Sequence, residues 1–149
     1  SAWVDMGGGQ IYYDSRDGFF RMNMDGSGRV KINSLIDNSH ASHDGRFIVG
    51  VGSDFSTYYR DNQSMIWKQV DTSSLRKLSR GANVLYYIQG TEIWKLDLES
   101  DTHSKVRSSS VDATRIEYVV KLIPSWDGNE LYMMIRVHTK DKRESKYPL

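Results

Sequence analysis

The sequence predicts an all-β fold made of repeated four-stranded antiparallel units, and three observations support it. Four short apolar strands each follow a tight turn that contains glycine. Their register positions, Ile11, Ile48, Leu85 and Leu131, are 37, 37 and 46 residues apart. Three of these strands are followed by a second strand that ends in an acidic turn. Strand-built units at this spacing are typical of the blades of a β-propeller.

The lead strands are predicted to alternate their side chains between two faces, one packed on the preceding blade and one on the next. A generic β-sandwich that repeats by chance is the alternative to this interpretation. The predicted lead strands are residues 9–13, 46–50, 83–87 and 129–133.

The second strands share a pattern at a similar place in three units. Two of them begin with Ile-Trp-Lys, which puts Trp67 and Trp94 at equivalent positions and predicts that both are at least partly buried between blades. Ile48, Leu85 and Leu131 are predicted core residues. A polar turn and a short strand that alternates basic and apolar residues follow each second strand, as expected in a four-stranded blade. The second strands are 19–25, 66–71 and 93–97, and the short strands are 29–32, 75–78 and 105–107.

The 149 residues form one predicted domain of about three and a half units, at about 1–33, 34–80, 81–109 and 110–149. Closed propellers have about 4 to 8 blades, and a half ring would expose two blade faces and unpaired strand edges. The first unit lacks a clear first strand, and the last stops after its second. The chain is therefore expected to be part of a larger propeller or to be completed by self-association, with a small four-bladed ring as the third possibility.

Three segments carry a resemblance to a known family. They are Asp25-Gly26-Ser27-Gly28, residues 39–46, and Pro124-Ser125-Trp126-Asp127-Gly128. They resemble the repeat of TolB-like propellers, part of the wider WD-like group. The first and third units depart from this pattern at residues 7–9 and 80–83. The resemblance implies a propeller fold and favours a periplasmic or secreted location.

Composition is that of a β-rich domain with no membrane span. Apolar residues make up 38% of the chain, and no apolar run approaches the length of a transmembrane helix. The lack of cysteine excludes disulfides and cysteine-based metal or redox sites. The formal net charge is +1, and basic residues are scattered among acids, which argues against a nucleic-acid partner.

The longest irregular stretches are predicted at residues 52–64 and 108–114. Aromatic and charged side chains gather in the first of them, and long loops are common binding sites. Such a mixture suits a sugar or a protein surface. The alternative is a long hairpin loop whose tyrosines cover a blade edge. The predicted binding residues are Phe55, Tyr58, Tyr59, Arg60 and Asp61.

The histidines are the only candidates for metal or acid–base chemistry. His40 and His43 are three apart before a predicted strand, where their side chains would point to opposite faces. The favoured interpretation is that one of them caps the blade turn through a hydrogen bond. The segment from Ser39 to Asp54 also resembles oligogalacturonate lyases, seven-bladed propellers that cleave pectin fragments by β-elimination. That resemblance implies a manganese ligand at His40 and finds no counterpart for the other ligands or the base.

The sequence therefore predicts a non-catalytic binding scaffold without a cofactor. Its expected partners are another protein, further copies of the chain, or a glycan, contacted through loops at one end of the ring. The alternative function is that of a carbohydrate-active lyase with a divalent metal such as manganese. A Gly-x-Ser-x-Gly elbow, a phosphate-binding Gly-Lys-Ser/Thr loop and a His-Glu-x-x-His motif are all missing from the chain.

Overall fold

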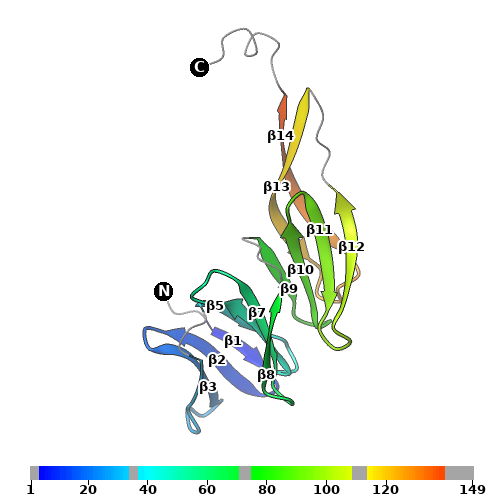
Figure 1. Cartoon of the computed structure of the whole chain (residues 1–149). Coiled ribbons are helices and arrows are strands. Elements are labelled where there is room, and N and C mark those ends of the chain that lie inside the picture. The colour runs from blue at the N-terminus through cyan, green and yellow to red at the C-terminus, as the bar shows by residue number, and fades with distance from the viewer. Residues whose placement is uncertain (1–3, 34–36, 71–74, 109–113, 140–149) are drawn as a thin grey trace.

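The computed structural model describes residues 4–33, 37–70, 75–108 and 114–139. Within these ranges the chain forms fourteen strands and no helix. The strands make three four-stranded antiparallel sheets and one two-stranded sheet (Figure 1). This confirms the predicted all-β fold of four-stranded antiparallel blades. In the part of the chain that is described, no helix is long and apolar enough to cross a membrane.

Each sheet is built from strands that are consecutive in the chain. Blade 1 contains β1 (Val4–Gly7), β2 (Gln10–Ser15), β3 (Gly18–Asn23) and β4 (Val30–Asn33). Blade 2 contains β5 (Asp37–Ala41), β6 (Phe47–Val51), β7 (Thr57–Asp61) and β8 (Ile66–Val70). Blade 3 contains β9 (Arg76–Ser79), β10 (Val84–Gln89), β11 (Glu92–Asp97) and β12 (Thr102–Ser108). Blade 4 contains β13 (Arg115–Pro124) and β14 (Leu131–Thr139).

The predicted register of the lead strands is confirmed by the pairing of the first two strands in each blade. In each blade the register residue of the second strand pairs with the last or the next-to-last residue of the first strand. The pairs are Met6 with Ile11, Ala41 with Ile48, Leu78 with Leu85, and Pro124 with Leu131.

The glycines of the first hairpin explain why it departs from the family pattern. Gly7 pairs directly with Gln10, so only Gly8 and Gly9 form the turn. Both have positive φ angles, of 57° and 75°, as a two-residue hairpin with two left-handed residues requires. In the other three blades the loop is two residues longer, at 43–46, 80–83 and 126–129, because main-chain bonds from the Ser42 N–H to the Phe47 carbonyl and from the Ser125 N–H to the Glu130 carbonyl extend two of the hairpins by one pair. Blade 1 therefore has a first strand, β1, that the sequence analysis did not identify.

Two strand assignments from the sequence were wrong. Residues 57–61 lie within the irregular stretch that the sequence predicts at 52–64, but they form β7, which pairs with both β6 and β8. The strand at 75–78 was assigned to the end of the second unit, but β9 pairs with β10 and begins blade 3. As a result Trp67 lies on the fourth strand of its blade and Trp94 on the third, so the two are not equivalent. Both are partly buried, as predicted.

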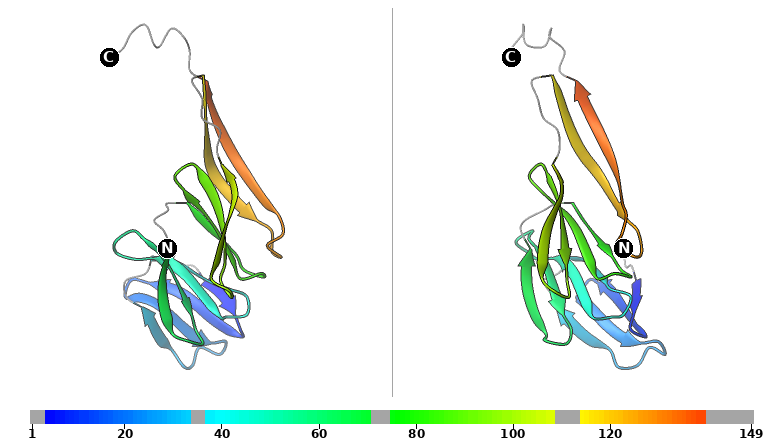
Figure 2. Two further views of the ribbon diagram at one scale, coloured as in Figure 1. Left: turned by 45° about the vertical axis from the view of Figure 1, so that its right-hand side comes forward. Right: turned by 90° about the vertical axis from the view of Figure 1, so that its right-hand side faces the viewer.

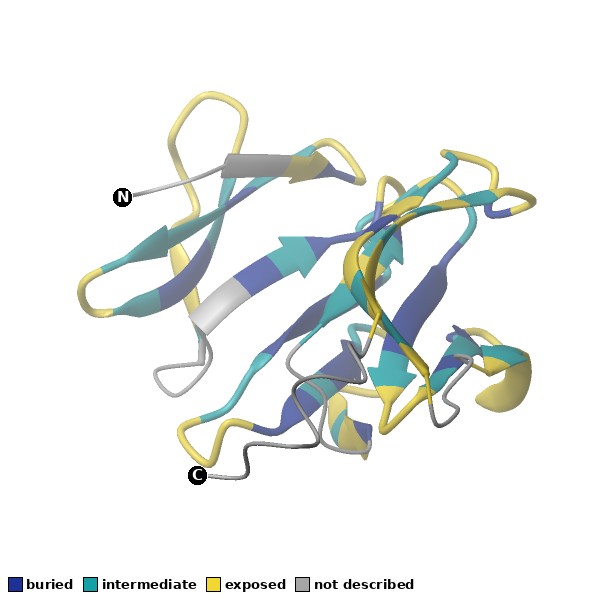
Figure 3. Ribbon diagram, turned by 90° about the horizontal axis from the view of Figure 1, so that it is seen from above, coloured by how far each residue is buried: buried dark blue, intermediate teal, exposed yellow. Residues whose placement is uncertain are grey.

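The blades pack face to face through three apolar clusters. Figure 3 shows the longest buried stretches within the strands, whereas the turns between them are largely exposed. Ile48 lies between blades 1 and 2, Leu85 between blades 2 and 3, and both are fully buried. Leu131 is partly buried against the cluster between blades 3 and 4. These positions confirm the predicted core.

The two outer faces of the array have no neighbouring blade among the described residues. Ile11, the blade 1 equivalent of the fully buried Ile48 and Leu85, is only half-buried. On blade 4, Tyr132 and Met134 are exposed, and the long hairpin of β13 and β14 extends beyond the other sheets (Figure 2). Within the described residues, blade 4 contains two strands, and the predicted division into about three and a half units stays a prediction.

Candidate functional site

The first hairpin turns of blades 2 and 4 are held by the same set of hydrogen bonds. In blade 2 the Ser42 hydroxyl donates to Asp44 Oδ1 at 2.6 Å, and the Arg46 N–H donates to the same oxygen at 2.9 Å. Ser125 and Asp127 repeat the first bond in blade 4 at 2.7 Å. The serine hydroxyl also accepts a main-chain N–H at the far end of each turn, from Phe47 in blade 2 and from Glu130 in blade 4, both at 3.0 Å. The Ser-x-Asp-Gly sequence therefore fixes a rigid loop.

A tyrosine of the preceding blade anchors each of these rigid loops. Tyr12 donates to the Gly45 carbonyl at 3.3 Å, and Tyr86 donates to the Gly128 carbonyl at 2.7 Å. Tyr12 and Tyr86 occupy equivalent positions, one residue after the register positions Ile11 and Leu85. The loops are thus aligned from blade to blade.

The first loop residues of three successive turns, His43, Arg80 and Trp126, meet at this end of the molecule. The rings of His43 and Trp126 are 5.0 Å apart in an edge-on contact. The Arg80 guanidinium carbon lies 6.0 Å from the centre of the indole. We call these three residues the turn cluster. They are 37 and 46 residues apart, the spacing of the register positions, and this signal in the sequence was missed.

Arg80 also ties three blades together near the turn cluster. Its Nε donates to the Ala41 carbonyl of blade 2 at 2.7 Å, and its Nη2 donates to the Met6 carbonyl of blade 1. Main-chain bonds run alongside, from the Gly8 N–H to the His43 carbonyl and from the His43 N–H to the Arg80 carbonyl. The backbone that carries the turn cluster is therefore hydrogen-bonded from blade to blade.

Trp126 is the large aromatic side chain of the turn cluster, and 55% of its surface is accessible. Its indole packs on the backbone of Gly81, where a Cβ would lie 2.2 Å from the indole nitrogen. Ser79 holds the same loop by donating to the Ser125 carbonyl at 2.6 Å. A fixed, exposed indole beside a guanidinium and an imidazole can stack on a ring or an apolar group and attract an acidic one.

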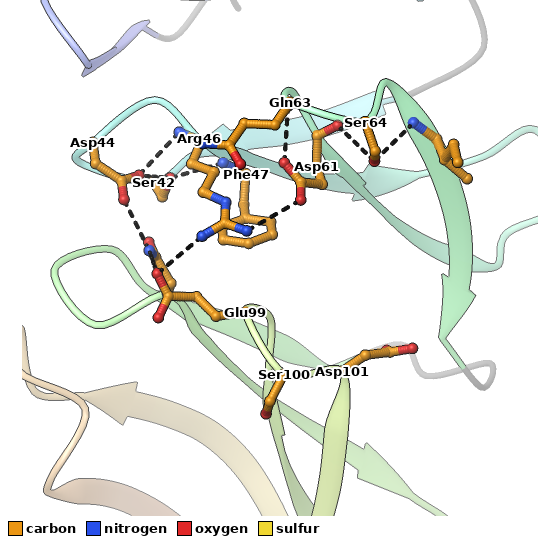
Figure 4. A network of polar contacts seen from close by, with 12 residues as sticks. Ser42, Asp44, Arg46, Phe47, Asp61, Gln63, Ser64, Glu99, Ser100 and Asp101 are labelled. Carbon is orange, nitrogen blue, oxygen red and sulfur yellow. Dashed lines mark hydrogen bonds and ion pairs between the residues drawn. The ribbon is translucent and has the colours of Figure 1, made fainter.

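Residues of the same hairpin loops also take part in a polar network that joins blades 2 and 3 (Figure 4). Arg46 bridges Asp61 of its own blade at 3.4 Å and Glu99 of blade 3 at 3.3 Å. Asn83 donates to Asp44 at 2.9 Å across the same interface. Burial of Asp61 raises its pKa, but bonds from the Gln63 N–H and Arg46 outweigh this and hold the pKa below its usual value.

The predicted binding residues do not form one surface. Phe55 lies in the turn between β6 and β7, with 84% of its surface exposed and a positive φ of 63°. Tyr58 is half-buried and donates to Asp54 at 2.5 Å. Asp61 ends β7, whereas Phe55 lies just before its start.

Tyr59 and Arg60 of the same set are buried and point to opposite faces of blade 2. Tyr59 packs in the cluster shared with blade 3 and donates its hydroxyl to Asp101. Arg60 lies on the face toward blade 1, with its guanidinium 5.9 Å from the Trp67 ring. The prediction of a loop failed because this stretch is a central strand. The binding role of the set stays a prediction, and only Phe55 is freely exposed.

The metal role predicted for His40 also stays a prediction. His40 lies on β5 opposite Val49 and is half-buried. Within the described ranges, no three His, Asp or Glu side chains come together in a way that could hold a metal ion. The capping role predicted for one histidine is not tested either. The position of His43 in the turn is compatible with it.

An apolar cleft of about 230 Å³ lies between the β10–β11 turn and β13. Ile93 and Val119 line it, together with Glu117. The Glu117 carboxylate pairs with Arg107 at 3.2 Å and with Arg115 at 3.0 Å, so its charge is compensated.

No family model and no curated protein matches the chain. Solved structures do match it in fold. The Cps50 (Swd1) β-propeller domain of Myceliophteria thermophila superposes with a TM-score of 0.60 and 13% identity, over 96% of this chain and 52% of that one. The N-terminal domain of Nup159 has a TM-score of 0.56 and 10% identity, over 92% and 43%. The tricorn protease has a TM-score of 0.52 and 14% identity, over 93% of this chain and 16% of that one.

At these identities the likeness shows the fold alone, which is that of a β-propeller. The chain spans about half or less of the length of the solved chains it matches.

Proposed function

We propose that this chain is a recognition scaffold, a propeller region of TolB-like type that binds a protein or a glycan through its turn cluster. The observation that carries the proposal is the exposed Trp126, which is held against Gly81 and His43 beside Arg80. Tryptophan and arginine are enriched among the residues that dominate binding energies at interfaces. An aromatic side chain that is already fixed loses little conformational entropy when a ligand binds.

The test is a selection of ligands for the whole chain, from a random peptide library and from a panel of immobilised oligosaccharides. Binders of the wild type are expected to lose at least tenfold in affinity with Trp126→Ala. Met24→Ala is the matched control, because this apolar side chain is similarly exposed at 57% but lies in the turn after β3. Binders that depend on Met24 and tolerate Trp126→Ala would overturn the proposal, and the library that yields binders identifies the partner class.

Phe55 is retained as a second proposed contact. A non-glycine residue with a positive φ is uncommon, and a phenyl group exposed this far presents a large apolar area at the tip of a turn. The turn is held by bonds from the Ser56 N–H to Asp54 at 3.0 Å and from the Phe55 N–H to the Gly52 carbonyl at 3.0 Å. Phe55→Ala in the same binding assays reports whether selected ligands use this turn.

We also propose that the two outer faces are completed, by further blades or by a second copy of the chain. The half-buried Ile11 and the exposed Tyr132 support this, because their equivalents between blades, Ile48 and Leu85 for the first and Val49 and Tyr86 for the second, are buried. Met134 is exposed on the same outer face as Tyr132. Sedimentation velocity of the 149-residue chain at micromolar concentration is expected to show a dimer. Met134→Glu should shift it to a monomer, because a charge would have to be buried. A well-folded wild-type monomer would contradict completion by a second copy.

A further inference from the structure

Two arginines face each other between blades 1 and 2. Arg21 lies on β3 directly opposite Tyr12, and Arg60 lies on β7 between Ile48 and Trp67. Tyr12, Ile48 and Trp67 belong to the apolar cluster that joins these blades. Both guanidinium groups are therefore on the facing surfaces of the interface, and Arg60 is only 7% exposed.

Neither arginine has an acidic partner among the described residues. The Nε atoms of both are buried without a hydrogen-bond acceptor. The groups around Arg60 are the Trp67 ring at 5.9 Å, the Tyr12 phenol and the like charge of Arg21. Burial, and next the charge of Arg21, hold the pKa of Arg60 below its usual value. An ionised group that is buried without a partner is unfavourable, so this arrangement calls for a compensating negative charge.

The interface between blades 2 and 3 contains the kind of acidic partner that Arg21 lacks. Tyr59 occupies the position in blade 2 that Arg21 occupies in blade 1, because Val49 pairs with Tyr59 as Tyr12 pairs with Arg21. Tyr59 meets the carboxylate of Asp101, which directly precedes the fourth strand of blade 3. The residue that directly precedes the fourth strand of blade 2 is Met65.

Met65 and Asp101 share a left-handed backbone, with φ angles of 59° and 55°. The two turns are alike in shape, and a thioether in one replaces the carboxylate in the other. The position from which an acid would face Arg21 is therefore occupied by a side chain without charge.

We propose that an oxyanion, namely a phosphate or sulfate group, binds between Arg21 and Arg60. Guanidinium groups present several donors in a planar fork that matches the oxygens of such groups, and two of them neutralise a doubly charged anion. This site is separate from the turn cluster and does not depend on the function proposed for it. The anion supplies the acceptors that both Nε atoms lack.

The test uses the whole chain and measures binding of inorganic phosphate and of sulfate by calorimetry, with chloride at equal ionic strength as the reference. Saturable binding is expected, together with a rise in melting temperature that follows ligand concentration. Arg60→Met and Arg21→Met should each weaken phosphate binding at least tenfold. Arg16→Met is the matched control, since this exposed arginine lies in the turn between β2 and β3 and should leave binding unchanged.

Folding of the variants is checked in chloride alone. There Arg60→Met should melt no lower than the wild type, because it removes an unpaired buried charge. Arg60→Lys keeps the charge without the fork and should bind phosphate more weakly than the wild type does. A phosphoserine peptide compared with inorganic phosphate separates a site for a free anion from one for a phosphorylated ligand. No saturable binding of any of these, or equal binding by the wild type and Arg60→Met, would overturn the proposal.

Discussion

The interfaces on the two sides of blade 2 are built from equivalent strands but differ in whether their polar side chains have carboxylate partners. Between blades 2 and 3, Tyr59 meets Asp101, Lys68 pairs with the same carboxylate at 3.0 Å, and Arg46 reaches Glu99. Between blades 1 and 2, Arg21 and Arg60 find no carboxylate among the described residues. The apolar cores are similar in kind, so the difference lies in the turn that faces each strand.

This comparison indicates how a repeat can acquire a site without changing its fold. Both turns carry an aspartate that accepts the N–H two residues later, at 2.9 Å from Gln63 to Asp61 and at 3.0 Å from Glu99 to Asp97. Both contain a left-handed residue before the fourth strand. The two turns share this backbone geometry, and we expect the identity of that one residue to decide whether the neighbouring interface is neutralised internally.

The largest expected effect concerns the apolar part of the comparison. Leu85→Ala should lower the free energy of unfolding by about 2–5 kcal/mol, because Leu85 is fully buried between blades 2 and 3. Ile11→Ala, at the equivalent position on the outer face of blade 1, should cost less than about 1.5 kcal/mol. Urea denaturation measures both. Equal losses would show that the outer face of blade 1 is packed as tightly as an interior interface.

The register and the turns could be predicted because they depend on local signals. Asp-Gly and Gly-Gly turns need left-handed backbone, and the apolar strand that follows each of them sets the repeat. The β7 strand was missed because its two faces are both buried. Arg60 and Asp61 are residue types that usually lie at the surface, and the strand has no alternation of apolar and polar residues.

The assignment of β9 and the composition of the turn cluster depend on contacts between residues distant in the chain. Residues 76–79 directly follow blade 2 in sequence, and only their pairing with β10 places them in blade 3. His43, Arg80 and Trp126 look unrelated as residue types. Their common position becomes visible only once the loops of different blades are aligned, although the spacing of 37 and 46 residues was present in the sequence.

The second prediction concerns the paired interface. Tyr59→Phe removes the hydroxyl that donates to Asp101 and should lower the free energy of unfolding by about 1–2 kcal/mol, since hydrogen bonds to charged groups are among the stronger ones. Tyr58→Phe is the control, because its hydroxyl bonds to the exposed Asp54. That change should leave the free energy of unfolding nearly unchanged, because substitutions of exposed groups usually have small effects. A cost for Tyr58→Phe as large as that for Tyr59→Phe would contradict the special role of this interface.

The third prediction uses pH to isolate the same contact. The Tyr59 hydroxyl and, to a lesser extent, Lys68 hold the pKa of Asp101 below its usual value. A depressed pKa contributes stability that is complete above the unfolded value of about 3.9 and is lost as the pH falls through the folded value. Urea midpoints between about pH 7 and pH 2.5 should therefore converge for the wild type and Tyr59→Phe at the acid end. A difference between the two urea midpoints that stays constant at all pH values would show that the Asp101 carboxylate does not cause it.

The smallest expected effect, and the sharpest test of the comparison, is to give blade 2 the turn residue of blade 3. Met65→Asp places a carboxylate where it can face Arg21, and the left-handed backbone at this position is more readily adopted by aspartate than by methionine. Stability should rise by about 0.5 kcal/mol more than with Met65→Asn, which relieves the backbone equally but carries no charge.

The difference between Met65→Asp and Met65→Asn should shrink at high salt, because partly exposed ion pairs are screened. The same acid should compete with an oxyanion for Arg21, so Met65→Asp should weaken phosphate binding while Met65→Asn leaves it intact. If aspartate and asparagine behave alike in both measurements, the turn residue does not control the charge of the interface. The two sides of blade 2 would then differ for reasons other than the one residue at position 65.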